Sequence, residues 1–409
     1  MRRFDHPRAS ALVFLAAAVL IWTGVWAAFL HAAPGEAPAS VSAGSGASFS
    51  AGSGASFSAG SGASFSAGSR ASSRASSGAG AGAMAGASAL APASTDAQAQ
   101  ADTASSSPGS AESRAVAYLA VEVPRWREAH PCYSCHNNGD GTRALLAASR
   151  LGLVEAARFA GSIDWLRTPE QWVLNADDGG VKDLPLARIQ FASALRVLVE
   201  AEPDQQPALE RAAALVIADQ QADGSWPINT SATIGSPAGY GPALATAMAR
   251  QLLVAVPTPD ARQALARADA WFRAAEPASV LDASAVLLGL GTADDAPASA
   301  TRARSLTVLR QGQAPDGGWG PYTTSPSEPF DTALAVLALE PLLARPALAA
   351  PVYDTETLRS VIAQGRAYLR GSQYTDGSWT ETTRPSGQES YAQRISTTAW
   401  ALVALLGGD

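Results

Sequence analysis

The chain has 409 residues, of which 16% are charged, and a formal net charge of −7. Its two cysteines can form one disulfide bond at most, which cannot stabilise a fold of this length and excludes a disulfide-framework protein. The whole net negative charge falls on residues 113–409, which argues against nucleic acid as a partner, because phosphate binding needs a basic surface.

The first segment, residues 1–33, is expected to be a membrane anchor or a signal peptide. Three arginines precede the uncharged apolar run 9–30, which exceeds the ~20 residues that a helix needs to cross a bilayer. The arginines predict that the rest of the chain lies outside the cytoplasm, on the periplasmic side. The alternative is cleavage at the small-residue site Ala37–Ala39, which would release a secreted protein.

Residues 34–112 are expected to form a disordered linker. The octapeptide AGSGASFS occurs three times within residues 43–66, and Gly, Ala and Ser dominate the segment. Small residues without apolar periodicity cannot bury enough surface to offset the loss of backbone entropy. The segment should therefore tether the folded part of the chain.

A short module, residues 113–150, contains the motif Cys-x-x-Cys-His at residues 132–136. This spacing is typical of haem c attachment, in which both thiols bond to the porphyrin and the adjacent imidazole binds the iron. Haem c is therefore the predicted cofactor, with Cys132 and Cys135 as attachment points and His136 as the metal ligand.

Three other interpretations of the motif stay open. Cys132 and Cys135 can form a disulfide or a redox dithiol, or the motif can bind zinc, for which His130 is the plausible further nitrogen ligand. It can also be a purely structural turn. No sixth iron ligand is evident, since the one later methionine, Met248, lies in an apolar helical stretch. A haem would then have an open position for an external ligand.

Residues 151–409 repeat a helix–turn–helix pattern and predict an all-α fold. The sequence Gln-x-x-Asp-Gly-x-Trp occurs three times, at Gln220–Trp226, Gln313–Trp319 and Gln373–Trp379. Each copy is followed by an apolar helical stretch that should be buried. These stretches are residues 241–256, 331–344 and 396–407. Two copies without the turn, in residues 154–201 and 268–290, bring the expected number of hairpins to about five.

The turn has a local physical rationale. Its Asp can accept from the neighbouring backbone, its Gly can take a positive φ, and its Trp can fill the gap between hairpins. The Gln is expected to accept from the indole N–H or to cap a helix end. Trp226, Trp319 and Trp379 are therefore interpreted as structural.

A Gln-x-x-Asp-Gly-x-Trp turn that closes an outer helix resembles the QW repeat of squalene/hopene cyclases and prenyltransferase-like proteins. The resemblance covers residues 151–409. It implies an α/α toroid, or an open arc, whose inner helices line a central cavity for an apolar or peptide ligand. The Cys-x-x-Cys-His segment also resembles an N-terminal module of bacterial toroid-repeat proteins of unassigned function.

The catalytic motifs of the resembled family are missing. Asp-x-Asp-Asp, with which cyclases protonate their substrate, has only incomplete counterparts at residues 175–178 and 292–295. Asp-Asp-x-x-Asp is missing too, and no His or Cys follows His136 that could complete a prenyltransferase zinc site. Whether the chain is an enzyme is therefore left open.

Asp282 and Asp331 are the candidate catalytic acids, because each opens an apolar helix at an equivalent repeat position. The favoured interpretation of both is an N-cap. Asp177, Asp178 and Asp183 lie in a Gly-rich stretch and are expected to be solvated turn residues.

Three functions follow from these observations. The first is an extracytoplasmic toroid-repeat binding or electron-transfer protein that carries haem c. The second is a terpenoid-cyclase-like or prenyltransferase-like enzyme with atypical acids. The third is a non-catalytic scaffold with a Cys132–Cys135 disulfide.

The haem prediction can be tested by expressing the full chain with a cytochrome c maturation system. We expect a red protein whose band keeps peroxidase activity on a denaturing gel, because thioether bonds survive unfolding. Cys135→Ser should weaken covalent retention, and His136→Ala should change the iron spectrum. A colourless protein in which mass spectrometry finds Cys132 bonded to Cys135 would contradict the prediction.

Overall fold

The computed structural model describes residues 109–130, 133–176, 183–229, 240–384 and 387–407. These residues are all-helical, with twelve α-helices and no strand among them, and they belong to one compact unit. None of the described helices is both long and apolar enough to span a bilayer. The predicted anchor at residues 9–30 and most of the predicted linker lie outside the described residues.

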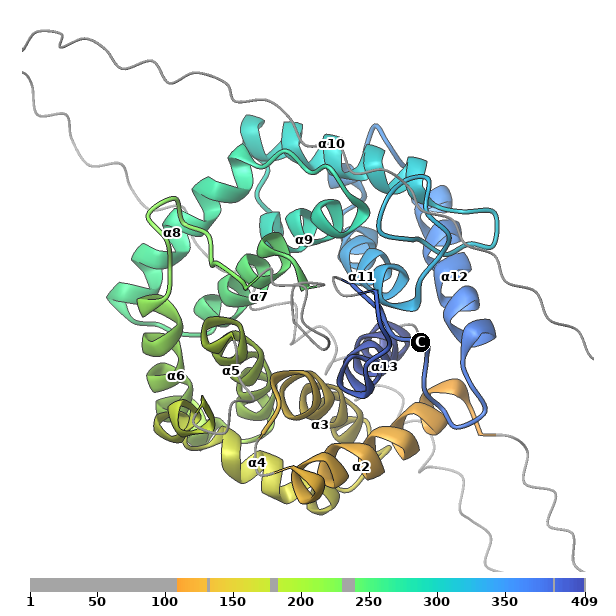
Figure 1. The fold of residues 1–409 in the computed structure, drawn as a ribbon. Helices are drawn as coiled ribbons and strands as arrows, with labels where there is room; N and C mark the ends of the chain where they lie inside the picture. The colour runs from red at the N-terminus through yellow and green to blue at the C-terminus, as the bar shows by residue number, and fades with distance from the viewer. Residues whose placement is uncertain (1–108, 131–132, 177–182, 230–239, 385–386, 408–409) are drawn as a thin grey trace, which may run out of the picture. The chain divides into compact units, whose positions relative to one another are not determined.

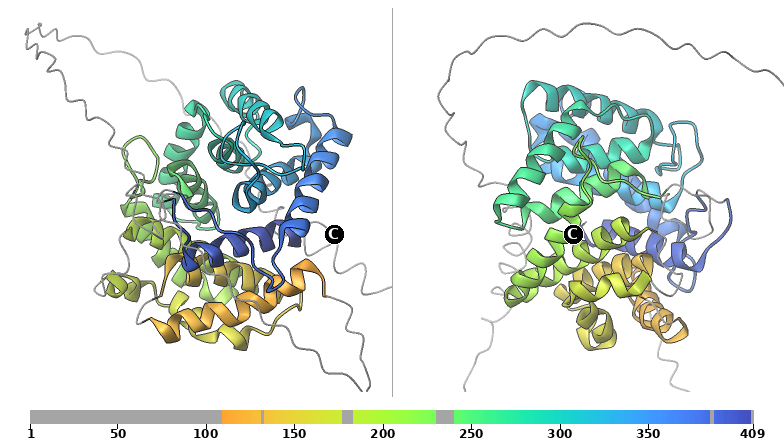
Figure 2. Two further views of the ribbon diagram at one scale, coloured as in Figure 1. Left: turned by 45° about the vertical axis from the view of Figure 1, so that its right-hand side comes forward. Right: turned by 60° about the vertical axis from the view of Figure 1, so that its left-hand side comes forward.

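The helices form two concentric layers in a toroid-like arrangement (Figure 1; Figure 2). The outer helices are α2 (Ala111–Ala129), α4 (Ala160–Leu166), α6 (Gln206–Ala218), α8 (Pro259–Ala274), α10 (Ala296–Gly312) and α12 (Thr355–Ser372). The inner helices are α3 (Thr142–Arg150), α5 (Leu184–Ala201), α7 (Pro242–Val254), α9 (Val280–Leu290), α11 (Pro329–Leu339) and α13 (Tyr391–Leu406). Each inner helix packs on the next, and α13 packs on α2 and α3, which closes the ring.

The described helices pair into six hairpins, one more than the five expected from the sequence. The additional hairpin is α2–α3, in the part of the chain that the sequence analysis treated as a separate module. A seven-residue π-helical segment, η1 (Cys135–Gly141), leads directly into α3. The Cys-x-x-Cys-His motif therefore lies in the first hairpin of the ring.

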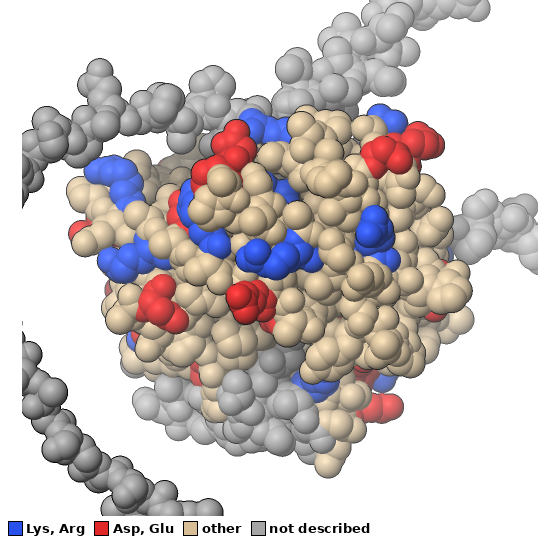
Figure 3. Space-filling model, turned by 90° about the horizontal axis from the view of Figure 1, so that it is seen from above, with Lys and Arg blue, Asp and Glu red and all other residues tan. Residues whose placement is uncertain are grey.

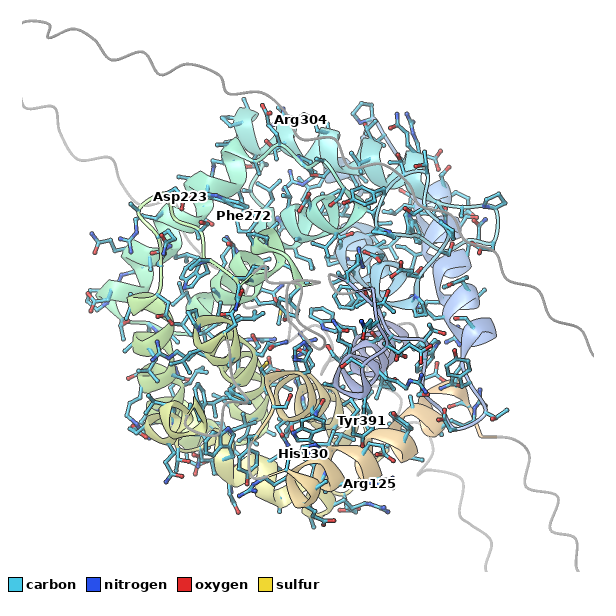
Figure 4. The ribbon with its side chains drawn as sticks, viewed as in Figure 1. Arg125, His130, Asp223, Phe272, Arg304 and Tyr391 are labelled. Carbon is cyan, nitrogen blue, oxygen red and sulfur yellow. The ribbon has the colours of Figure 1, made fainter. Side chains whose placement is uncertain are left out.

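The inner helices are apolar and buried, as the sequence predicts. In α11 every residue except Leu337 is buried. The hairpin α8–α9 has no Asp-Gly-x-Trp turn, and there Phe272 fills the space between its two helices (Figure 4). A Cβ atom at Gly289 of α9 would lie 2.2 Å from the Phe272 ring, so the two helices approach closely at this point.

The three tryptophans of the repeat are structural, as predicted. Each indole is fully buried, and each Nε1 donates to a carbonyl near the end of the preceding outer helix, at 2.7 or 2.8 Å. Each Trp backbone N–H also donates to a threonine hydroxyl on the following inner helix. These threonines are Thr246, Thr332 and Thr398.

The expected pairing of the glutamine with the indole N–H is wrong. Instead, each glutamine Nε2 donates to the carbonyl of the turn glycine and to a carbonyl of the next outer helix, at 2.9–3.1 Å. For Gln373 the next outer helix is α2, where the acceptor is Ala111. The glycines need their positive φ, and a Cβ atom on Gly377 would lie 2.3 Å from the Arg114 carbonyl oxygen.

Basic and acidic side chains are interspersed on the outer side of the ring that Figure 3 shows. Many of the arginines are paired with carboxylates, for example Arg359 with Glu356 at 3.5 Å and Arg211 with Glu170. Exposed pairs of this kind add little stability. The burial of the inner helices and the turn tryptophans therefore carries most of the fold's stability.

We expect Trp319→Ala to lower the free energy of unfolding by about 3–5 kcal/mol, because it empties a fully buried site and leaves the Leu309 carbonyl without its indole donor. Urea denaturation followed by circular dichroism measures the change. Tyr322→Ala is the matched control, since Tyr322 is 59% exposed only three residues away. Equal effects of the two substitutions would show that the turn tryptophan is not an anchor of the ring.

Candidate functional site

The described half of the Cys-x-x-Cys-His motif is packed into the wall of the ring. Cys132 lies outside the described residues, whereas Cys135 and His136 begin η1 and are 9% and 7% exposed. Cys135 has no disulfide partner among the described residues, and its Sγ lies 3.3 Å from Nδ1 of His136. Burial raises the pKa of the Cys135 thiol to about 12 and lowers the pKa of His136 to about 4. At neutral pH the pair is a neutral thiol beside a neutral imidazole, unlike the ion pair of an activated cysteine nucleophile.

The packing of η1 does not accommodate a porphyrin as it stands. All seven residues of the segment are buried, against α2, α5 and α13. A Cβ atom at Gly139 would lie 2.9 Å from Gln190, and one at Gly141 would lie 2.5 Å from Val123. A haem at Cys135 and His136 would have to replace these contacts. Because Cys132 is not described, the predicted haem and the alternative disulfide both stay predictions.

The zinc alternative gains no support from the described residues. Among them no group of three or more His, Cys, Asp or Glu side chains is arranged to hold a metal ion. The imidazole of His130 stacks on Trp126 with 3.8 Å between ring centroids, and its Nδ1 lies 3.0 Å from the Trp126 carbonyl oxygen. Figure 4 shows His130 at α2, on the side of the ring where Tyr391 also lies.

A buried aspartate that the sequence analysis missed, Asp140, joins three segments of the inner layer. It is 1% exposed, and its Oδ2 accepts from Gln190 Nε2 of α5 at 3.0 Å. The same oxygen accepts from Ser396 Oγ and Trp400 Nε1 of α13, at 2.7 and 3.2 Å. Burial raises the pKa of Asp140, and Arg143 and the three hydrogen bonds oppose that shift.

Arg143 lies beside this aspartate and is held by an aromatic ring. Its guanidinium carbon is 3.9 Å from the centroid of Trp400, and its Nη1 donates to the sulfur of Met248 at 3.6 Å. The ring of Tyr240 meets Trp400 edge-on, with 5.8 Å between centroids. We name Asp140, Arg143, Gln190, Tyr240, Ser396 and Trp400 the Asp140 cluster.

Several polar atoms of the Asp140 cluster are buried with no hydrogen-bond partner among the described residues. They are Nε and Nη2 of Arg143, Oε1 of Gln190 and the hydroxyl of Tyr240. Buried polar groups are nearly always paired in folded proteins, and each unpaired group costs about 1–3 kcal/mol. These four atoms belong to three separate segments of the chain. They therefore mark a candidate site for an additional molecule that can form hydrogen bonds with them.

The candidate acids Asp282 and Asp331 are not N-caps, contrary to the favoured interpretation. Each is the third residue of its helix, and the caps are Ser279 and Glu328. Ser279 supplies the capping hydroxyl to the backbone N–H of Asp282 and donates to its carboxylate at 2.8 Å.

Asp331 is completely buried, and only one of its two carboxyl oxygens has a described hydrogen-bond partner. Its Oδ2 accepts from Arg384 at 2.7 Å, whereas its Oδ1 has no partner within the part of the chain that the structure describes. Burial raises the pKa of Asp331 to about 7, although Arg384 acts in the opposite direction. This carboxyl can therefore carry a proton near neutral pH.

Asp183 is not a solvated turn residue, contrary to expectation. It is 5% exposed, caps α5 by accepting from the Leu186 backbone N–H at 3.0 Å, and also accepts from the backbone N–H of Asn229. Asp177 and Asp178 lie outside the described residues.

Comparison with known proteins leaves the family open. No family model matches the chain, and none of the curated proteins matches it. Among solved structures, a polysaccharide lyase aligns with 73% of this chain and 97% of its own, at 11% sequence identity and a TM-score of 0.44. So weak a likeness assigns neither an activity nor a substrate. The QW-repeat likeness to squalene/hopene cyclases stays a resemblance.

Asp331→Asn tests the buried carboxyl through the pH dependence of stability. Folding raises the pKa of Asp331 from 3.8 to about 7, so the native state binds this proton more tightly than the unfolded state. The group therefore makes the free energy of unfolding fall as the pH rises from about 4 to about 7. The stability difference between wild type and variant should change across that window and stay constant above it.

Urea denaturation at several pH values measures this difference. Leu337→Ala is the control, because it weakens the same helix without removing a titrating group. Parallel pH profiles for wild type and Asp331→Asn would contradict the raised pKa.

Proposed function

We propose that the chain is a binding protein that works outside the cytoplasm and holds a small polar ligand at the Asp140 cluster. The apolar run at residues 9–30 supports the location. A polar ligand replaces the apolar or peptide ligand that the resemblance implies, because an apolar molecule would leave the cluster's polar atoms unpaired. The proposal does not require haem.

The observation that carries the proposal is the set of unpaired atoms around one well-bonded aspartate. Asp140 is fixed by three donors, and Arg143 is held against Trp400, so the cluster is organised before a ligand arrives. Arg143 offers donors, Gln190 offers an acceptor, and the hydroxyl of Tyr240 can do either. Such preorganised, complementary groups at one place are what a binding site for a polar molecule requires.

Thermal denaturation of the full chain against a compound panel tests the proposal. The panel contains sugars, amino acids and hydroxy acids, with farnesol and squalene as apolar members. A ligand at 100 times its Kd adds about 2.7 kcal/mol, which should raise the midpoint by roughly 5 °C. Stabilisation by an isoprenoid and by no polar compound would contradict the proposal.

Tyr240→Phe shows whether a stabilising compound binds at the cluster. The hydroxyl has no described partner, so its loss should leave the stability of the free protein within about 1 kcal/mol but weaken the compound's binding about three- to tenfold. Tyr353→Phe is the matched control, because its hydroxyl is also buried and unpartnered among described residues but lies beside the outer helix α12. Equal binding of the compound by both variants would show that the compound does not bind at the cluster.

A second candidate function is acid catalysis by Asp331 in a terpenoid-cyclase-like enzyme. The observation that favours it is a buried carboxyl with one unpaired oxygen and a pKa raised to about 7. Such a group can donate a proton to a substrate at neutral pH. Conversion of an isoprenoid by the wild type but not by Asp331→Asn would favour acid catalysis over the binding of a polar ligand.

A further inference from the structure

We infer that the ligand of the Asp140 cluster carries a carboxylate, which Arg143 binds through Nε and Nη2. This inference rests on the proposed function and adds the chemical class of the ligand. Three observations support it: the free edge of the guanidinium, the position of Asp140, and the positive charge of Arg196 near Arg143.

One edge of the Arg143 guanidinium is free and fixed in place. Nη1 is directed to the sulfur of Met248, whereas Nε and Nη2 are buried without a described partner. The N–H groups of Nε and one Nη of an arginine point in parallel, which matches the two oxygens of a carboxylate. Arg143 is 8% exposed and packs on Trp400, so little side-chain entropy remains to be lost on binding.

Asp140 does not fill this position. Its Oδ1 lies 3.8 Å from Nη2 of Arg143, which is too long for a hydrogen bond. Its Oδ2 is held by Gln190, Ser396 and Trp400. These three donors fix the carboxyl group at a distance from the arginine. Asp140 therefore orients the site and leaves the two donors of Arg143 for another acceptor.

The neighbouring charges favour one more anion. Arg150 and Arg196 share a single carboxylate, that of Glu200. Burial, Arg143 and Arg150 lower the pKa of Arg196 to about 10, so Arg196 lies within electrostatic range of both other arginines. The positive charge of Arg196 would therefore attract an anion bound at Arg143.

A carboxylate fits these observations better than a phosphate or a sulfate. The free edge offers two parallel donors from one arginine, which match the two oxygens of one carboxylate. A dianion would lie close to Asp140 without a second arginine to hold its remaining oxygens. The neighbouring hydroxyl of Tyr240 stays neutral at pH 7, because burial raises its pKa.

Titration of the full chain with matched pairs of compounds tests the inference. The pairs are lactate and lactamide, glutarate and glutaramide, and gluconate and sorbitol, with sulfate and phosphate as separate anions. Thermal midpoints and tryptophan fluorescence report binding. We expect at least one carboxylate to bind at least about tenfold more tightly than its neutral partner. Its affinity should fall with added salt.

Two substitutions locate the carboxylate. Arg143→Lys keeps the charge but removes the two-donor edge, so it should abolish the preference for the acid over its neutral partner. Arg196→Gln should weaken the binding of the acid about threefold or more and leave the binding of the neutral compound unchanged. Arg125→Gln is the control, because the Arg125 side chain is 68% exposed. Circular dichroism confirms that each variant folds.

The outcomes separate the inference from the proposed function. If acids and their neutral partners bind equally and Tyr240→Phe weakens both, the inference of a carboxylate is overturned, whereas the proposed binding of a polar ligand stands. Tighter binding of sulfate or phosphate than of any carboxylate would overturn the inference and show that the site binds another class of anion. No binding by any member would overturn both the inference and the proposed function.

Discussion

The ring depends on the hydrogen bonds that each Gln-x-x-Asp-Gly-x-Trp turn makes with three helices. The indole N–H binds the outer helix before the turn, the Trp backbone N–H binds the inner helix after it, and the Gln amide binds the next outer helix. A turn of this kind fixes the angle between successive hairpins as well as the loop itself. At the last turn the next outer helix is α2, so the bond from Gln373 to Ala111 closes the ring.

Closure of the ring is also what assembles the Asp140 cluster. Asp140 lies on the first hairpin, whereas Ser396 and Trp400 lie on the last, more than 250 residues later. These groups meet only when α13 packs on η1 and α3. The same contacts bring Trp400 over Arg143. Stability of the ring and geometry of the candidate site are therefore coupled, and a weakened turn at Trp379 should disturb both.

The sequence predicted the features that depend on local patterns. Asp-Gly-x-Trp marks where an outer helix ends, and the apolar stretches after it mark helices that are buried all round. The positive φ of Gly224, Gly317 and Gly377 and the burial of the tryptophans follow from the same short motif. The sixth hairpin escaped prediction because α2–α3 has no such turn and its connection carries Cys-x-x-Cys-His, which suggested a separate module.

The candidate site could not be predicted in the same way, because its contacts join distant parts of the chain. Gln190, Ser396 and Trp400 are polar or partly polar residues on largely buried inner helices that also carry other polar side chains, so nothing in the sequence singled them out. Asp282 and Asp331 were chosen by their place at helix starts. The structure distinguishes them by burial: Asp282 is half-buried and bonded to its cap, whereas Asp331 is completely buried with one oxygen unpaired.

The Cys-x-x-Cys-His motif and the Asp140 cluster belong to one structural unit. Cys135, His136 and Asp140 all lie in η1, and Asp140 is the charge that adds most to the raised pKa of the Cys135 thiol after burial itself. The same aspartate acts on Tyr240, whose pKa is raised mainly by burial and further by Asp140. A bond formed at Cys135, to haem or to Cys132, would change the packing of the segment that positions Asp140. The chemistry of the motif and ligand binding at the cluster should therefore depend on each other.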